Sequence, residues 1–276
     1  MVVTRWCRGE IAPGTWRWLC RALVVQFLGM LVMSWIVRSP EIHRATPFYH
    51  YVSILGVGRM GGNAGAWVFS ACFWLFAILL VPWHTHIIRV VREANRGAAG
   101  VLIPLAVMGV VGAALVGTFD PGQMGPIPRK FTLVMHGIGA ACAFSGHVFV
   151  AFLSWAVFAL EYRSAAAERR QEMPHPGKLL VPVVILALTV VGVAFSGFAE
   201  LAAGGRAFTE AGGWSPAAQL FLGLPFWEWS LTLALMFWLF GMSLWWPDPL
   251  VRTSSEQASS LQVQSVQERN PSPQLS

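Results

Sequence analysis

The stretch GTFDPGQMGPIPRKFTLVMHGIGAACAFSGHVFVAFLSW, residues 117–155, decides the fold. It holds a short polar turn with Asp120, followed by a long apolar run that two histidines interrupt, His136 and His147. About 20 apolar residues in a helix suffice to cross the hydrocarbon core of a bilayer. Because similar apolar runs precede and follow this one, the sequence predicts an all-α integral membrane protein.

The composition supports this class of protein. Of the 276 residues, 55% are hydrophobic and only 12% are charged, whereas soluble domains carry roughly 25% charged residues. The formal net charge is +6, but the basic residues lie between the apolar runs and do not gather on one soluble domain. We therefore expect membrane lipids as partners and no nucleic acid; the oligomeric state is left open by the sequence.

Six apolar runs predict a bundle of six transmembrane helices, at residues 19–37, 64–82, 98–118, 131–160, 179–198 and 225–246. The run 131–160 is longer than a minimal span, so we expect it to tilt or to protrude. Residues 1–18 form a basic head with interleaved Trp residues, which is typical of a segment on a membrane surface. Residues 19–246 form the membrane domain, and residues 247–276, rich in Ser and Gln, form a disordered tail.

Basic residues indicate the orientation of these spans. With a cytoplasmic N-terminus, 12 of the 19 Lys and Arg residues lie in cytoplasmic segments near the spans, and one lies far out in the tail. The outer loops hold the other six: Arg38, Arg44, Arg59, Arg129, Lys130 and Arg206. Cytoplasmic loops carry the excess of Lys and Arg in membrane proteins. The head and the tail are therefore both predicted to be cytoplasmic.

In this topology several polar residues fall at the outer face: Ser53, Asn63, Asp120, His136, Glu200 and Glu228. Ionisable groups at or within a span are candidates for function, although loop residues are also polar simply because they contact water. We expect an outward-facing pocket near the outer leaflet, bordered by Ser53, Asp120, His136 and Glu228. In this hypothesis His136 and Arg129 contact the phosphate of a lipid headgroup, and Asp120 orients His136.

The histidines do not predict a metal site or a cofactor. His136 and His147 are eleven residues apart, about 16 Å along a helix, which is too far for one metal ion. Two haems would require deep histidines on a facing span, and the remaining histidines fall in loops or at span ends. We expect His147 to hydrogen-bond to a neighbouring helix. His84-Thr85-His86 is interpreted as a polar helix exit.

Two other classes of function remain open. A membrane-embedded hydrolase or acyltransferase would use Ser53 as nucleophile, His136 as base and Asp120 as the orienting acid. The sequence contains neither a G-x-S-x-G nor an H-E-x-x-H motif. A transporter of lipids or small molecules needs polar groups deep in the bundle, and the predicted spans carry few.

Four short motifs occur in order around the six runs: Ser53-Ile54-Leu55-Gly56, a loop with Asn63, Val116–Pro121, and His136–Ala140 with Phe144 behind it. The order of these motifs resembles that of the six-span bacterial and archaeal membrane family catalogued as domain of unknown function 998. The resemblance covers about residues 20–246. The chain is also similar to the eukaryotic family of FGF-receptor-activating protein, damage-regulated autophagy modulator and Sfk-type proteins.

The resemblance implies a six-helix bundle with Ser53, Asp120 and His136 as its marked residues, and a role in lipid handling, to which the eukaryotic relatives are linked. The loop from Asp120 to Lys130 is longer and richer in Pro and Gly than expected for that family. The chain departs from the family pattern there.

Overall fold

The computed structural model describes residues 10–38, 51–59, 62–121, 127–166, 170, 174–202 and 223–246. The first nine residues of the predicted head and the whole predicted tail lie outside these ranges. The described residues form six α-helices and one short 3-10 helix: α2 (Pro13–Ile36), η2 (Val52–Gly56), α3 (Ala64–Ala94), α4 (Arg96–Thr118), α5 (Arg129–Ser164), α7 (Pro176–Ala202) and α9 (Leu224–Trp245). The predicted all-α class is confirmed.

Each predicted span corresponds to one of these helices. Five of them, α2, α3, α4, α5 and α7, are long and apolar enough to cross a membrane. The sixth, α9, is not in that set; it carries Glu228 and four Trp residues along its length, and these lower its hydropathy. The coarse prediction of a multispan helical membrane protein therefore holds, and a sixth crossing by α9 stays a prediction.

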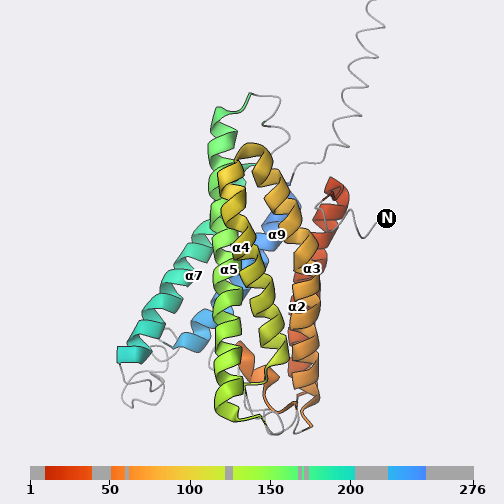
Figure 1. The fold of residues 1–276 in the computed structure, drawn as a ribbon, viewed down its shortest axis with the longest axis vertical. Coiled ribbons are helices and arrows are strands. Elements are labelled where there is room, and N and C mark those ends of the chain that lie inside the picture. Colours follow the sequence, from red (N-terminus) through yellow and green to blue (C-terminus); the bar gives the residue numbers. More distant parts are fainter. Residues whose placement is uncertain are drawn as a thin grey trace, which may run out of the picture.

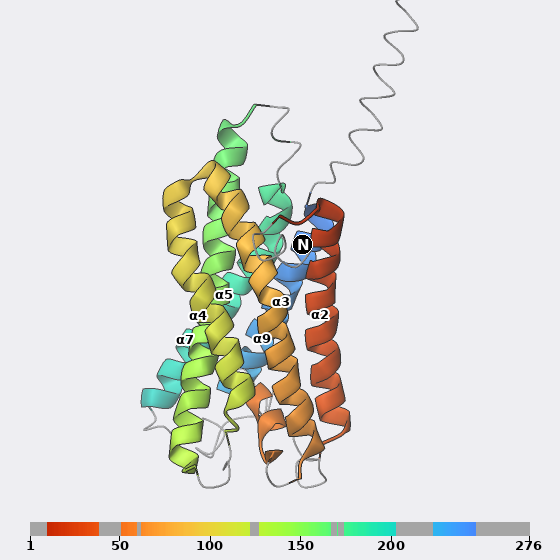
Figure 2. The ribbon, with the colours of Figure 1, turned by 45° about the vertical axis from the view of Figure 1, so that its right-hand side comes forward.

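The helices pack as a bundle around a continuous apolar core. α4 packs against both α3 and α5, α2 packs against α3 and α9, and α7 packs against α9 and α5. Figure 1 shows α7 leaning away from α5 towards its C-terminal end, and Figure 2 shows α9 running behind α3 and α5.

Two glycine pairs bring α4 and α5 into backbone contact. A Cβ atom on Gly112 would lie 2.6 Å from the carbonyl oxygen of Gly139, and one on Gly146 would lie 2.5 Å from the amide nitrogen of Gly109. Real Cβ atoms do not approach other atoms so closely, so only glycine fits. Such close helix approach through small residues is common in membranes.

The first helix begins earlier than the apolar run alone predicts. α2 starts at Pro13, where the missing N–H of proline is harmless because the first turn of a helix has no internal acceptor for it. Trp16, which we expected on the membrane surface, is fully buried. Its ring stacks on His86 at 4.3 Å and on Trp83 at 5.8 Å between centroids.

The second helix ends later than predicted. α3 continues for twelve residues past Pro82, to Ala94. His84 and His86 are only 3% and 7% exposed, so the interpretation of this segment as a polar helix exit is wrong. Hydropathy falls at the histidines, but the helix does not end there, because their rings pack inside the bundle.

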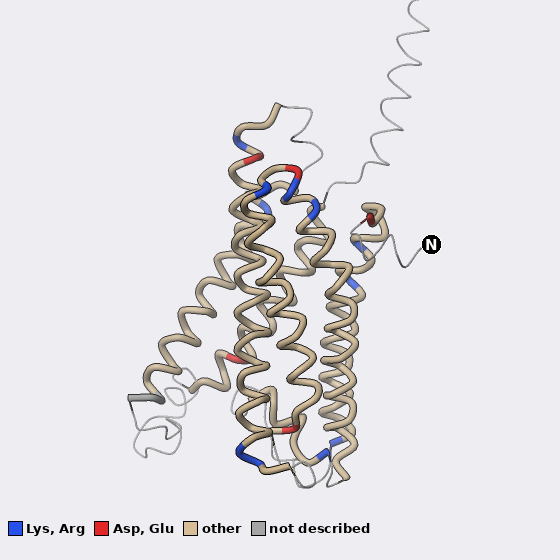
Figure 3. The backbone as a smooth tube through the Cα atoms, viewed as in Figure 1, with Lys and Arg blue, Asp and Glu red and all other residues tan. Residues whose placement is uncertain are grey.

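The two ends of the bundle carry the charges. Figure 3 shows blue segments at both ends of the tube and a wide belt without Lys or Arg between them. The Arg17 guanidinium donates to the Trp246 carbonyl from Nε (3.0 Å) and Nη2 (2.7 Å), which joins the start of α2 to the end of α9. We call the end of the bundle where Arg17 meets Trp246 the terminal end. The opposite end, which contains η2 and the start of α5, is called the loop end.

Candidate functional site

The site lies at the loop end, where the segment 51–59 folds over the bundle. Asp120, just after α4, is 3% exposed, and its Oδ2 accepts a hydrogen bond of 2.8 Å from the Arg59 backbone N–H. A buried carboxylate needs such partners because it has left water. Asp120 therefore fixes the end of the segment that carries Ser53.

The Arg59 side chain closes the same junction. Its guanidinium donates to the Ser70 hydroxyl (2.9 Å) and to the carbonyls of Gly117 (3.2 Å) and Thr118 (2.6 Å). It also lies 5.2 Å from the centroid of the Trp67 ring. The carbonyls at a helix C-terminus lack intrahelical donors, and here the guanidinium supplies donors to those at the end of α4. The turn with Gly58 at φ +82° allows the chain to bring Arg59 inward.

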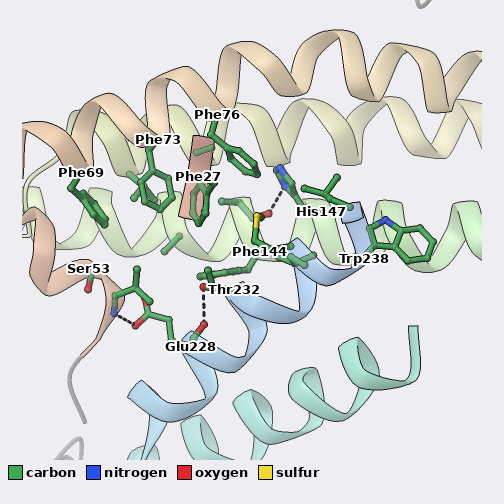
Figure 4. A pocket seen from close by; sticks show the side chains of 18 of the residues that line it. Phe27, Ser53, Phe69, Phe73, Phe76, Phe144, His147, Glu228, Thr232 and Trp238 are labelled. Carbon is green, nitrogen blue, oxygen red and sulfur yellow. Dashed lines mark hydrogen bonds between the residues drawn. The ribbon is translucent and has the colours of Figure 1, made fainter. Parts of the chain in front are cut away.

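The other end of the segment is fixed by α9. The Val52 N–H donates to Glu228 Oε2 at 3.0 Å, and Thr232 Oγ1 donates to the Glu228 backbone carbonyl at 2.8 Å. Figure 4 shows the Glu228 carboxylate reaching from α9 towards the residues beside Ser53. Helices that are far apart in the sequence thus hold Ser53 from both sides.

His136 lies about two turns into α5 and faces the same region. Its Nδ1 is 2.8 Å from the Phe119 carbonyl, and its Nε2 is buried without a partner among the described residues. A carbonyl can only accept, so Nδ1 carries the proton in the neutral ring and Nε2 presents a lone pair. His136 is therefore poised to accept a hydrogen bond.

Two hollows meet at these residues. The inner cavity has a volume of about 50 Å³ and lies between α3, α5 and α9. The second is an open groove of about 360 Å³, walled by α5, α9, the segment near Tyr51 and Val193 of α7. Five residues line both hollows: Ser53, His136, Ala140, Phe144 and Glu228.

The inner cavity is almost wholly aromatic and aliphatic beyond its polar mouth. Figure 4 shows Phe69, Phe73 and Phe76 in a row along α3, with Trp238 of α9 at the far end. The walls are mostly apolar along the cavity, apart from His147 and Thr232, and the hydrogen-bonding residues at its mouth are Ser53, His136 and Glu228. A molecule that fits both parts is amphipathic.

Three of the residues predicted to form the pocket are brought together, and two are placed elsewhere. Ser53, His136 and Glu228 line both hollows, whereas Asp120 lies behind them, bonded to Arg59. Arg129 is exposed at the start of α5 and lines neither hollow. The side chain of Glu200 lies outside the described residues.

The deep histidines differ from expectation. His147 Nδ1 is 2.7 Å from the Ala143 carbonyl of its own helix, so the predicted hydrogen bond to a neighbouring helix is wrong. Its ring instead meets His84 of α3 edge to face, with 5.2 Å between centroids. His84 Nδ1 likewise faces its own helix, 2.9 Å from the Leu80 carbonyl. In each imidazole the i−4 carbonyl therefore pairs with Nδ1, whereas Nε2 is buried without a partner among the described residues.

Over the described residues, no group of three or more His, Cys, Asp and Glu side chains could hold a metal ion. The three described cysteines, Cys20, Cys72 and Cys142, are free thiols.

Sequence reasoning missed Arg59 and His84. Arg59 was counted only as one basic residue of an outer loop, yet it is 8% exposed and bonded to three groups. A signal existed: a single arginine between glycine turns, in a loop at the same membrane face as the lone Asp120. His84 carried no signal, because nothing in the sequence pairs it with His147.

The fold and the site define a class: a helical multi-pass membrane protein with an amphipathic hollow at one end. No family model, no curated protein and no solved structure matches the chain.

Proposed function

We propose that this protein binds a lipid whose polar head carries hydroxyl groups, with the head at Ser53, His136 and Glu228. One observation carries the proposal: these three residues line both the open groove and the apolar cavity behind it. A lipid that enters the groove meets the polar residues first. The cavity, with room for a few water-sized groups, takes the end of one chain.

The chemistry of the three residues selects the head. His136 offers the Nε2 lone pair, Glu228 offers carboxylate oxygens, and Ser53 offers a hydroxyl that accepts or donates. Acceptors bind donors, so a hydroxyl or amine suits the site better than a phosphate. The exposed position of Arg129 points the same way, because none of the described residues that line the groove is a Lys or an Arg.

The hydrolase alternative lacks its central contact. A serine nucleophile is activated by a base within hydrogen-bond reach, at about 2.6–3.2 Å. In the described part of the chain, Ser53 makes no hydrogen bond to His136, whose Nδ1 faces Phe119. Binding without reaction therefore agrees better with the geometry, and transport of the bound lipid is the second candidate because the groove lies between helices α5 and α9.

The orientation of the protein in the membrane is part of the same proposal. Among the described residues the terminal end holds eight basic residues: Arg17, Arg21, Arg89, Arg92, Arg96, Arg163, Arg170 and Lys178. The loop end holds four: Arg38, Arg59, Arg129 and Lys130. We propose that both termini are cytoplasmic and that the groove faces the outer leaflet. Membership of the six-span family that the chain resembles is part of the same proposal, and the link of its eukaryotic relatives to lipid handling agrees with it.

The test uses lipids that remain on the purified protein. Ala140 lines both hollows, and Ala140→Trp fills their junction. The matched control is Val134→Trp on the same helix, at a position that is 58% exposed and lines neither hollow. Mass spectrometry of the extracted lipid should show a hydroxyl-bearing lipid on the wild type and the control but not on Ala140→Trp. Equal lipid content in all three proteins would refute the proposal.

A further inference from the structure

A second groove lies at the terminal end, on the outer face of α3 and α4. Its volume is about 670 Å³. The α3 wall runs from Val81 to Arg92, and the α4 wall runs from Ile103 to Val111. None of its lining residues belongs to the site at the loop end.

The length of this groove matches one leaflet. From Val81 to Arg92 the α3 wall rises about 16 Å, at 1.5 Å per residue. The hydrocarbon core of a bilayer is about 30 Å thick, so the wall covers about half of it. A single lipid of the leaflet at the terminal end therefore fits along the groove.

The walls and the mouth differ in chemistry. Ile103, Val107 and Val111 line the α4 side and are 43%, 56% and 50% exposed, which suits contact with an acyl chain. Arg89 and Arg92 line the mouth, where both side chains are exposed and one helical turn apart. Arginine is well suited to phosphate because its planar guanidinium donates two parallel hydrogen bonds.

Glu93, the acidic residue beside Arg89, does not neutralise the positive charge at the mouth of this groove. Arg89 Nε lies 3.7 Å from Glu93 Oε1, and the two side chains are 49% and 65% exposed. An exposed ion pair of this kind is weak, at most about 1 kcal/mol. A lipid phosphate can therefore replace Glu93 at Arg89 while Arg92 adds a second cation.

We propose that this groove binds an anionic phospholipid, with its phosphate at Arg89 and Arg92 and one chain along α4. The terminal end carries the excess of basic residues, and basic pockets between helices on the cytoplasmic side bind anionic headgroups. A neutral lipid would use only the apolar wall, so the charges give the preference. The inference does not depend on the function proposed for the loop end.

The test is a titration of the full-length protein in neutral detergent with short-chain phosphatidylglycerol, followed by the shift in Tm. Arg89→Gln with Arg92→Gln removes the two cations. The control is Arg163→Gln with Lys178→Gln, which removes the same charge from exposed positions at the same end that do not line the groove. All four side chains are exposed, so the folded state should tolerate both double variants.

We expect the apparent Kd for phosphatidylglycerol to weaken at least about tenfold in the Arg89/Arg92 variant, which corresponds to about 1.4 kcal/mol. The control variant should bind like the wild type, and phosphatidylcholine should bind equally weakly to all three. A third variant, Val107→Trp, fills the groove and should weaken binding with both arginines present. Equal loss in the control, or equal response to phosphatidylcholine, would show general charge attraction or detergent-like partitioning and overturn the proposal.

Discussion

The two ends of the bundle are closed in different ways. At the terminal end the rings of Trp16, Trp83, His86 and Trp246 pack against one another and fill the space between α2, α3 and the end of α9. At the loop end polar groups join the helices through hydrogen bonds, and hollows remain between them. Aromatic packing thus anchors one end, while hydrogen bonds hold open a space at the other.

Trp16→Ala should have the largest effect on stability, because the indole is fully buried at the centre of the aromatic cluster. Truncating a buried tryptophan costs about 3–5 kcal/mol through lost contacts and the cavity left behind. Unfolding of the purified protein in mixed micelles measures the loss. Trp18→Ala, at a site that is 70% exposed, is the control and should unfold like the wild type. Equal stability of the two variants would contradict the anchoring role.

Arg59→Met tests the hydrogen-bonded end. The change keeps an unbranched side chain but removes the donors to Ser70, Gly117 and Thr118. Leaving buried acceptors unpaired costs about 1–3 kcal/mol each, partly recovered by relaxation, so we expect a loss of about 2–4 kcal/mol. Arg129→Met, exposed at the same end, should cause no measurable change. If both variants behave alike, Arg59 does not hold the loop end together.

Comparing Glu228→Leu with Glu228→Gln separates the effect of side-chain shape from that of the hydrogen bond between Val52 and Glu228. Leucine leaves the Val52 N–H without its acceptor and should destabilise by about 1–3 kcal/mol. Glutamine retains a carbonyl oxygen at the same place and should cost less than half as much. Hydrogen exchange at Val52 reports the local effect, with faster exchange in the leucine variant. Equal exchange in the two variants would show that the contact does not position the segment.

Ser53→Ala should have the smallest effect. Its hydroxyl lies at the mouth of the cavity and makes no hydrogen bond to His136 in the described part of the chain. If the lipid is bound without reaction, the variant loses only the one hydrogen bond that the Ser53 hydroxyl offers to the lipid head, so we expect a partial loss of bound lipid and a wild-type Tm. A serine-reactive fluorophosphonate should not label the wild type at Ser53. Specific labelling there, lost in Ser53→Ala and in His136→Ala, would instead support the hydrolase alternative.

Hydropathy predicted the helices well because the apolar residues of each run are the ones that contact lipid or the core of the bundle. It failed at the ends of helices: α3 passes Pro82 and two histidines because neighbouring rings bury them, and this depends on residues distant in sequence. The candidate site was found only in part. Ser53, His136 and Glu228 were chosen because they are polar residues at one membrane face, but the hydrogen bonds of Asp120 and Arg59 depend on how two loops meet.

The glycine contacts between α4 and α5 decide which wall of the loop-end groove can move. Where backbones touch at Gly109, Gly112, Gly139 and Gly146, no side chain can change rotamer to let the helices slide. We therefore expect α4 and α5 to move together as one rigid unit, so that the α5 side of the groove stays in place. A lipid that widens the groove must therefore displace α7 or α9. Its binding should change the distance between spin labels on α7 and α5, whereas the distance between labels on α4 and α5 should not change.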